Sequence, residues 1–236
     1  MQISNYSLGG KNVFVIAEIG NNHNGSVELA LEMVDAAHEA GANCVKFQMR
    51  NMSSVYRKKS LAKQGEDLGT EYVLDLLERF QLTHDEHKHV AKYCKGKGIL
   101  YMCTPWDADS IVVLEALGVP AYKVASADLT NLPLIDRLID TQKPLILSTG
   151  MSSVEEIQIT TDFLNSKNAD FALLHCNSTY PAPFHDINLN WLKKLKSIHS
   201  LIGYSGHERG IAVTLAAVGL GAKVVERHFT FDRSME

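Results

Sequence analysis

The sequence predicts a (β/α)8 barrel, also called a TIM barrel, as a single domain over residues 1–236. Eight short apolar segments recur along the chain, and each of them except the last is followed by a segment with helical spacing of apolar residues. The loop after the first apolar segment, GNNHNG, does not match the GxGxxG turn that usually follows the first strand of an open doubly wound sheet. The open sheet is therefore the less favoured alternative.

The first strand is expected at 13–19, where an almost wholly apolar run is typical of a parallel strand covered on both faces. Ser26 then offers an N-cap for a helix over 27–40, in which apolar residues repeat every three or four positions. The second strand is expected at 44–48. The polar stretch 49–69 is interpreted either as a loop over a functional site or as a solvated excursion, because long loops without regular structure are often functional.

Two capping boxes mark later helix starts, and a glycine marks one helix end. The boxes are Thr83-x-x-Glu86 and Ser153-x-x-Glu156. The helix after the first box is expected to stop at Gly96 or Gly98. Further helices are expected at 70–80, up to 117, from 132, at 191–198 and at 211–220. Further strands are expected at 99–104, 121–126, 144–148, 171–176, 201–205 and 223–226. Because the sequence stops a few residues after the eighth strand, we expect the barrel to lack its last helix.

Composition excludes several classes of protein. The formal net charge is −4 and the basic residues are spread along the chain, unlike the basic patch of a nucleic-acid-binding protein. Apolar runs do not reach the length of roughly 18 residues that a membrane span needs. The 4 cysteines show no CxxC spacing, and the first residues are polar and unlike a signal peptide. We therefore expect a cytoplasmic protein with reduced thiols, without nucleic-acid or membrane partners.

Polar residues gather at the predicted strand ends, which in a barrel of βα units face the same edge, where active sites are built. The candidate site residues are Glu18, Lys46, Gln48, Thr104, Lys123, Ser126, Asp128, Ser148, Ser178, Tyr180, Ser205, His207 and His228. Lys46 and Lys123 lie inside otherwise apolar strands, where an unpaired ammonium group is costly to bury. Together with the hydroxyls, they suit a small anion that carries both phosphate and carboxylate. The alternative is a pair of internal salt bridges, Lys46 with Glu18 and Lys123 with Asp128.

The histidines divide into three groups. His207 and His228 follow two neighbouring predicted strands, so they form either a two-imidazole metal site or two hydrogen-bonded loop histidines. His175 lies within a strand and is interpreted as a core histidine, whereas His23 is a candidate supporting residue near Glu18. The histidines in helical segments are expected on the surface: His38, His84, His87, His89 and His199.

Seven segments, in order along the chain, resemble the sialic acid synthase family of barrel enzymes. They are AEIGNNHNG (17–25), VKFQ (45–48), KVASAD (123–128), LSTGMSS (147–153), LLHCNSTYPAP (173–183), GYSGH (203–207) and ERHFT (226–230). The resemblance implies condensation of phosphoenolpyruvate with N-acetylmannosamine or a related amino-sugar aldehyde, in a homo-oligomer such as a dimer. It also implies a divalent metal, usually Mn²⁺ with Mg²⁺ or Co²⁺ as alternatives, on His207 and His228.

The same resemblance implies roles for the other candidates. Lys46, Thr104 and Ser126 would bind the carboxylate, and Lys123, Ser148, Ser178 and Ser205 the phosphate. Glu18 would act as acid, base or water-orienting carboxylate, assisted by Gln48, while Asp128 and Tyr180 would meet the sugar. Position 128 is Asp where neuraminate-making members often carry Glu, which leaves relatives that use other modified amino sugars open.

Two other functions compete with this hypothesis. A sister barrel that uses a phosphorylated sugar should contain a second basic cluster, and the sequence offers one only over 50–63. A truncated remnant would hold phosphoenolpyruvate and metal without turnover.

Overall fold

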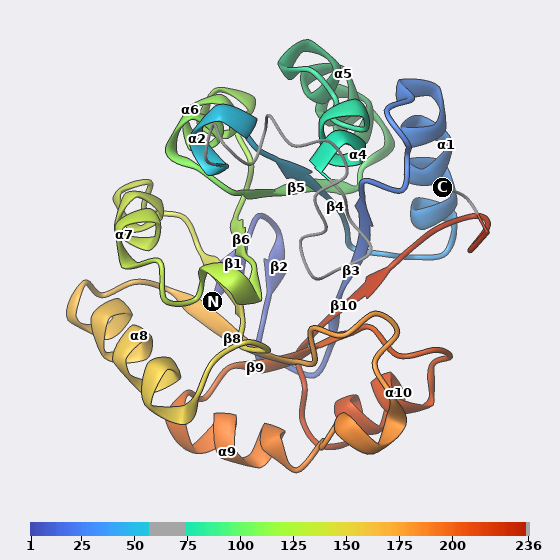
Figure 1. The fold of residues 1–236 in the computed structure, drawn as a ribbon. Helices are drawn as coiled ribbons and strands as arrows, with labels where there is room; N and C mark the ends of the chain where they lie inside the picture. Colours follow the sequence, from blue (N-terminus) through green and yellow to red (C-terminus); the bar gives the residue numbers. More distant parts are fainter. Residues whose placement is uncertain (57–73, 235–236) are drawn as a thin grey trace. The chain divides into compact units, whose positions relative to one another are not determined.

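The computed structural model describes residues 1–56 and 74–234. Within these residues, eight strands form one sheet in the order β5-β4-β3-β10-β9-β8-β7-β6 (Figure 1). The strands are β3 (Phe14–Gly20), β4 (Cys44–Met49), β5 (Leu100–Pro105), β6 (Tyr122–Val124), β7 (Leu145–Ser148), β8 (Phe171–Cys176), β9 (Ile202–Gly206) and β10 (Val224–His228). These eight parallel strands, with helices between them, confirm the predicted (β/α)8 barrel class.

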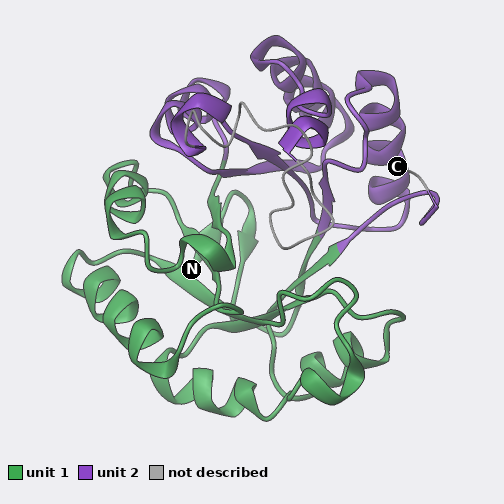
Figure 2. Cartoon of the chain, viewed as in Figure 1, with its two compact units in different colours: residues 1–16, 120–227 green, residues 17–119, 228–236 purple. Residues whose placement is uncertain are grey.

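The chain falls into two compact units, each made from two stretches of sequence (Figure 2). Unit 1 contains Met1–Ile16 and Pro120–Arg227, and unit 2 contains Ala17–Val119 and His228–Glu236, of which the structure describes residues up to 234. The boundary cuts β3 and β10, so each of these strands contributes residues to both units.

Unit 1 contains strands β6 to β9, most of β10, and the helices that connect them. The helices are α7 (Leu132–Asp140), α8 (Val154–Ser166), α9 (Trp191–Ile198) and α10 (Ala212–Gly219). Each strand pairs in parallel with the next, and β8 is buried along its whole length. The core includes Tyr122, Leu173 and Tyr204, which are at most 1% exposed. An antiparallel pair that the sequence did not predict, β1 (Gln2–Ile3) and β2 (Tyr6–Ser7), also belongs to this unit.

Unit 2 contains most of β3 together with β4 and β5. Its helices are α1 (Val27–Glu39), α2 (Met52–Val55), α4 (Leu74–Arg79), α5 (His84–Lys97) and α6 (Ala108–Leu117). Strands β4 and β5 form a parallel ladder from Cys44 to Met49, and Met33, Phe47 and Met102 are fully buried around it. The predicted helix at 70–80 is observed from Leu74, and its first residues lie outside the described part, as do residues 57–69 of the polar stretch.

Helix ends follow the local chemistry that the sequence predicted. The Thr83 and Ser153 side chains accept hydrogen bonds from the backbone N–H groups of Glu86 and Glu156, and both glutamates return a bond to the cap residue. The Ser26 side chain accepts from Leu29 N in the same way. Gly98 ends α5 in the left-handed conformation, with φ +78°, which glycine adopts without steric cost.

Three local expectations are wrong. The strand expected at 121–126 ends at Val124, because Ser126–Asp128 form a 3₁₀ turn closed by Asp128 N–H to the Ala125 carbonyl. His228 is the last residue of β10 rather than a residue beyond it. His87, expected on the surface, is 1% exposed. The His87 side chain lies on the buried face of α5, and its Nδ1 lies 2.8 Å from the Tyr101 hydroxyl oxygen. The expected surface position was therefore wrong, because this residue belongs to the inward face of the helix.

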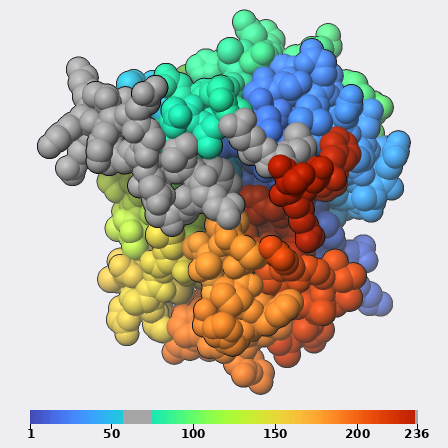
Figure 3. Space-filling model, turned by 45° about the vertical axis from the view of Figure 1, so that its right-hand side comes forward, coloured from blue at the N-terminus to red at the C-terminus, as the bar shows by residue number. Residues whose placement is uncertain are grey.

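Helix α10 exposes apolar side chains on the surface of unit 1, where it appears red-orange in Figure 3. Ile211, which precedes the helix, is 71% exposed, and Leu215 within it is 62% exposed. The sequence-based expectation of a homo-oligomer stays a prediction. Within the part of the chain that the structure describes, none of the helices has the length and apolar character to cross a membrane.

Candidate functional site

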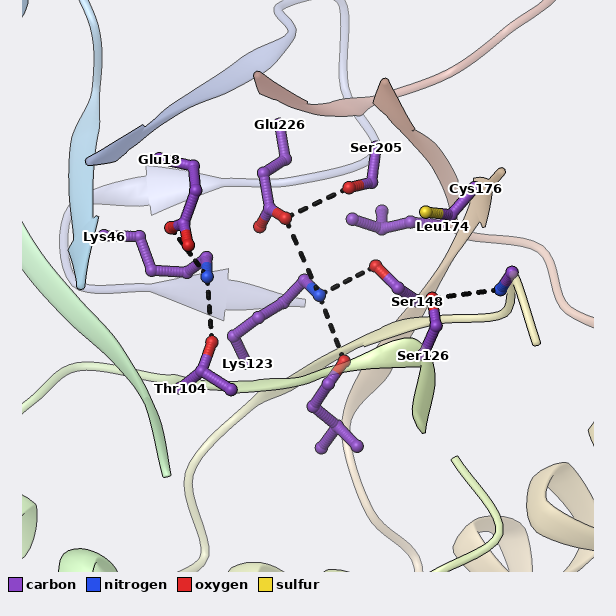
Figure 4. Close-up of polar contacts among 12 residues, drawn as sticks. Glu18, Lys46, Thr104, Lys123, Ser126, Ser148, Leu174, Cys176, Ser205 and Glu226 are labelled. Carbon is purple, nitrogen blue, oxygen red and sulfur yellow. Dashed lines mark hydrogen bonds and ion pairs between the residues drawn. The ribbon is translucent and has the colours of Figure 1, made fainter. Parts of the chain in front are cut away.

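The first polar cluster lies in unit 2, at the carboxyl ends of β3, β4 and β5. Lys46 Nζ lies 2.7 Å from Glu18 Oε2 and donates a hydrogen bond to Thr104 Oγ1 at 2.8 Å. Figure 4 shows the three side chains pointing toward one another. The Lys46 and Glu18 side chains are only 4% and 2% exposed. The salt bridge that the sequence offered as an alternative for Lys46 is therefore confirmed, and it lies at the predicted edge of the strands.

A row of hydrogen bonds extends this cluster along β4. Gln48 Nε2 donates to Glu18 Oε1 at 3.0 Å, and Arg50 donates to Gln48 Oε1. The Arg50 guanidinium also lies over the Trp106 ring, 4.9 Å from its centroid. The row thus brings the cationic side chains of Lys46 and Arg50 close to the Glu18 carboxylate, and cations of this kind can contact an anionic ligand.

The second polar cluster lies in unit 1 and is built around Lys123. Lys123 Nζ donates to Ser148 Oγ at 2.7 Å and to the Val124 carbonyl at 3.0 Å, and it lies 3.7 Å from Glu226 Oε1 (Figure 4). Ser205 Oγ donates to the same Glu226 oxygen at 3.0 Å. The sequence suggested Asp128 as the carboxylate for Lys123, whereas the carboxylate observed here is Glu226.

Strand register explains why these side chains meet. In the parallel ladders, Ser205 is opposite Cys176 on β8 and Glu226 on β10. Side chains alternate between the two faces of a strand, so residues paired in register share a face. The Cys176 thiol is buried beside this cluster, and burial raises its pKa above the usual value. Cys176 is therefore a neutral lining residue rather than a thiolate.

Ser126 and Asp128 sit on the 3₁₀ turn after β6. Ser126 Oγ accepts a hydrogen bond from Gly150 N at 3.1 Å, which ties the turn to the loop after β7. Asp128 accepts from Asn131 Nδ2 at 3.0 Å, and burial raises the pKa of its carboxyl. Asp128 thus faces a partly dry environment and is positioned by its own turn.

Ser178 lines a pocket of about 370 Å³ in unit 1, beyond the carboxyl ends of β7 and β8. The lining is mostly polar and includes Thr149, Ser152, Asn177, Asp186 and Trp191. The hydroxyl of Ser178 therefore faces space that a small polar ligand can enter.

His207 is held in a defined orientation after β9. Its ring stacks on Tyr180 with centroids 3.9 Å apart and an interplanar angle of 27°. Its Nδ1 lies 2.5 Å from the Asn177 carbonyl oxygen, which can only accept, so Nδ1 carries the proton. The lone pair is then on Nε2, and metal-binding histidines use this tautomer, with the other ring N–H fixed by a carbonyl.

The second histidine of the predicted pair, His228, ends β10 and is half-buried. The β9–β10 ladder ends with Gly206 opposite Arg227, the residues that directly precede His207 and His228. Within residues 1–56 and 74–234, no group of three or more His, Cys, Asp or Glu side chains is arranged to hold a metal.

Comparison with protein-family models adds decisive evidence. The model of the NeuB family matches residues 33–236. The chain belongs to the NeuB family.

Curated relatives of this NeuB-family chain include synthases of sialic and related acids. It is 38% identical to an N,N'-diacetyllegionaminic acid synthase of Campylobacter jejuni, over 95% of this chain and 70% of the relative. It is 35% identical to the N-acetylneuraminate-9-phosphate synthase of Mus musculus, over 96% of this chain and 65% of the relative. The chain thus spans about two thirds of the length of the curated relatives that it matches.

A solved structure supports the fold assignment. The crystal structure of an N-acetylneuraminic acid synthetase from Leptospira borgpetersenii, in complex with citrate, matches with a TM-score of 0.90 and 35% identity. The match covers 99% of this chain and 79% of that one.

Glu226 is the main residue that sequence reasoning missed in this NeuB-family chain. It is 5% exposed and belongs to the Lys123 cluster. A usable signal was present, since Glu226 and His228 are two residues apart in one strand and therefore share a face.

His23, the candidate supporting residue, lies in the buried interior of unit 2. Its ring lies 5.8 Å from that of Phe47, and its Nδ1 accepts a hydrogen bond from Gly25 N at 3.1 Å. Desolvation lowers the pKa of His23 to about 4, so it is neutral at pH 7. It shapes the loop after β3 as a neutral hydrogen-bond acceptor.

Proposed function

We propose that this chain condenses phosphoenolpyruvate with an open-chain amino sugar, N-acetylmannosamine or a related one, to give a nonulosonic acid and phosphate. The observation that carries the proposal is the repeated use of a buried lysine with a hydroxyl and a carboxylate, once around Lys46 and once around Lys123. Buried cations at strand ends suit a substrate with two anionic groups. The names of the relatives support the same reaction class.

Each cluster receives one end of phosphoenolpyruvate in this proposal. Lys46 and Thr104 bind the carboxylate, with Ser126, and Lys123 and Ser148 bind the phosphate, with Ser178 and Ser205. Asp128 and Tyr180 contact the sugar. Glu18 is held by Lys46 and Gln48, so it remains an ionised acceptor that can orient water.

The bond changes balance without a further reactant. Carbon 3 of phosphoenolpyruvate attacks the sugar aldehyde carbon, and the aldehyde oxygen gains a proton and becomes a hydroxyl. Carbon 2 becomes electron-deficient, and water adds there and loses one proton. Phosphate then leaves as the bond between carbon 2 and the phosphate oxygen breaks, while the new hydroxyl on carbon 2 gives its proton to the phosphate and becomes the ketone of the product. Glu18 accepts or returns a proton of this water in our proposal.

The residues present fit a divalent ion, because His207 has the tautomer that leaves Nε2 as the ligand atom. His207 and His228 would hold Mn²⁺, with Mg²⁺ or Co²⁺ as alternatives. When bound, such an ion supplies Lewis-acid polarisation of the aldehyde oxygen.

The test is phosphate release from phosphoenolpyruvate with Mn²⁺ across a panel of amino sugars. We expect release that depends on one sugar and is lost in His207→Ala. The matched control is His84→Ala, because His84 is an exposed histidine at the start of α5. Equal activity in both variants would contradict the role of His207.

If no sugar in the panel supports phosphate release, binding of phosphoenolpyruvate is measured next. If calorimetry then detects phosphoenolpyruvate binding that Lys123→Met removes, the chain holds the anion but does not complete the reaction alone. If binding is absent as well, the proposal is wrong.

A phosphorylated amino sugar is the second candidate substrate, because the mouse relative is named for a 9-phosphate product. The basic cluster that the sequence offered over 50–63 is described only up to residue 56, and its Arg50 is engaged with Gln48 and Trp106. Adding the 6-phosphate of each sugar to the panel distinguishes the two substrates by their kcat/KM values.

A further inference from the structure

A partly buried ion pair is adjacent in sequence to the residues that the proposed metal would use. Glu208 directly follows His207, and Arg227 directly precedes His228. Arg227 Nη1 forms an ion pair with Glu208 Oε1 inside unit 1. The Glu208 side chain has 0% exposure and that of Arg227 has 25%. The pair therefore connects the backbone next to one histidine with the backbone next to the other.

Arg227 holds the loop after β9 by more than one contact. Besides the Glu208 carboxylate, its Nη2 donates to the Glu208 carbonyl and to the Gly210 carbonyl, the latter at 3.0 Å. A guanidinium fork can satisfy these acceptors together, whereas a lysine ammonium group is a single point charge. The backbone of residues 208–210 is thus fixed onto the end of β10.

The Glu208 carboxylate is itself held from the other side. Tyr204 Oη donates to Oε2 at 2.7 Å, and Thr214 Oγ1 at the start of α10 donates to Oε1 at 3.4 Å. Burial, together with the hydrogen bond to Glu208, raises the pKa of Tyr204. Both carboxylate oxygens are therefore engaged, and Glu208 has little freedom to move.

Gly206 makes room for this arrangement. A Cβ atom on Gly206 would clash with Arg227 Nη1, the Tyr204 ring and Glu208 Oε2. Gly206 is also the residue opposite Arg227 in the ladder. The absence of a side chain here lets the guanidinium reach across the strand end to Glu208.

A buried ion pair is weak evidence for stability, because desolvation offsets the attraction between the charges. Its two members are the sequence neighbours of His207 and His228, which suggests a geometric role. We propose that the Arg227–Glu208 pair is a positioning device, which sets the spacing and orientation of His207 and His228 for a divalent cation. This inference rests on the proposed function, and Arg227 and Glu208 act through the histidines without touching substrate.

The test measures Mn²⁺ binding to the protein in the absence of substrates, with electron paramagnetic resonance to detect the unbound ion. We expect wild-type protein to bind Mn²⁺ and His207→Ala to lose this binding. Arg227→Met and Glu208→Gln should each weaken binding about 10- to 100-fold, the usual effect of removing a group that orients a metal ligand. Arg227→Lys should recover only part of the affinity.

Arg209→Met is the matched control, because Arg209 is exposed in the same loop. It should bind Mn²⁺ like wild type. Thermal unfolding of each variant shows whether it is folded at the temperature of the titration. If Arg227→Met does not fold, Glu208→Gln still tests the proposal, because its side chain keeps an acceptor for the Tyr204 hydroxyl. If the folded Arg227 and Glu208 variants bind Mn²⁺ with an affinity within threefold of wild type, this inference is wrong and the proposed function is unaffected. Wild-type protein without Mn²⁺ binding would overturn the metal part of the proposed function, and this inference with it.

Discussion

Each unit contains a buried lysine within a strand, and the two lysines have different kinds of partner. In unit 2, Lys46 lies 2.7 Å from the Glu18 carboxylate, so the two charges form a close pair. In unit 1, Lys123 lies 3.7 Å from Glu226, and its shorter contacts, at 2.7 and 3.0 Å, are to the Ser148 hydroxyl and the Val124 carbonyl. The lysine of unit 2 is matched by charge, whereas that of unit 1 is matched mainly by neutral oxygens. Replacing each lysine should therefore lower the free energy of unfolding by a different amount.

The largest expected effect is on Lys46. Lys46→Met leaves Glu18 ionised in a dry environment, which should lower the free energy of unfolding by about 3–5 kcal/mol. Lys123→Met should lower it less, because Lys123 Nζ lies 3.7 Å from Glu226 whereas Lys46 Nζ lies 2.7 Å from Glu18, so less charge attraction is lost. Urea unfolding of both variants measures the difference. The double variant Lys46→Met with Glu18→Gln removes the stranded charge and should recover part of the loss. A greater loss for Lys123→Met than for Lys46→Met would reverse the comparison.

Acid should destabilise unit 2 before unit 1. Desolvation lowers the pKa of His23 to about 4 and that of His87 to about 3, while an unfolded histidine titrates near 6.5. The unfolded state therefore takes up protons first, and stability that is complete above about pH 6.5 is lost as the pH falls toward 4 and 3. The free energy of unfolding should drop by about 2 kcal/mol for each histidine at pH 5. In unit 1, burial also lowers the pKa of His175.

The 2 tryptophans of the chain separate these responses, since Trp106 lies in unit 2 and Trp191 in unit 1. Trp191→Phe leaves fluorescence that reports on unit 2, and Trp106→Phe leaves fluorescence that reports on unit 1. Urea midpoints at pH 7 and pH 5 then give the acid sensitivity of each unit. His23→Asn and His87→Asn should flatten the pH dependence of unit 2. An unchanged midpoint for unit 2 at pH 5 would argue against buried neutral histidines.

The smallest expected effects are those of removing the two helix caps, one in each unit. Thr83→Ala removes the cap of α5 in unit 2, and Ser153→Ala removes the cap of α8 in unit 1. Each should lower the free energy of unfolding by about 1 kcal/mol, because one backbone N–H loses its acceptor. The same single-tryptophan backgrounds show whether each loss stays within its own unit. Equal shifts of both probes would indicate that the two units unfold together.

The sequence predicted the fold well where a single interaction decides the structure. Fully buried strands such as Phe171–Cys176 appear as apolar runs, and capping boxes are local in sequence. The short β6 was overestimated because Ser126 and Asp128 join a turn that competes with the strand, and apolar spacing does not reveal this competition. The antiparallel β1–β2 pair was missed because two-residue strands are too short to show alternation.

The candidate site was predictable at the level of residue type and strand position. Lys46 and its partner Glu18 followed from the cost of burying an amine. The partner of Lys123 did not, because β6 and β10 are not neighbours in the sheet and the contact depends on which side chains meet inside unit 1. The orientation of His207 was also beyond the sequence, since it depends on Tyr180 and on a backbone carbonyl 30 residues away.

The division of β3 and β10 between the units has a consequence for biosynthesis. Unit 1 needs residues 1–16 together with residues 120–227, and unit 2 needs residues 17–119 together with the residues from 228 onward. A chain emerging from the ribosome therefore presents β3 long before β10, one of the two strands that flank it in the finished sheet. This edge of β3 stays unpaired until residues 224–228 have been synthesised, and an unpaired strand edge can pair with another chain in the meantime.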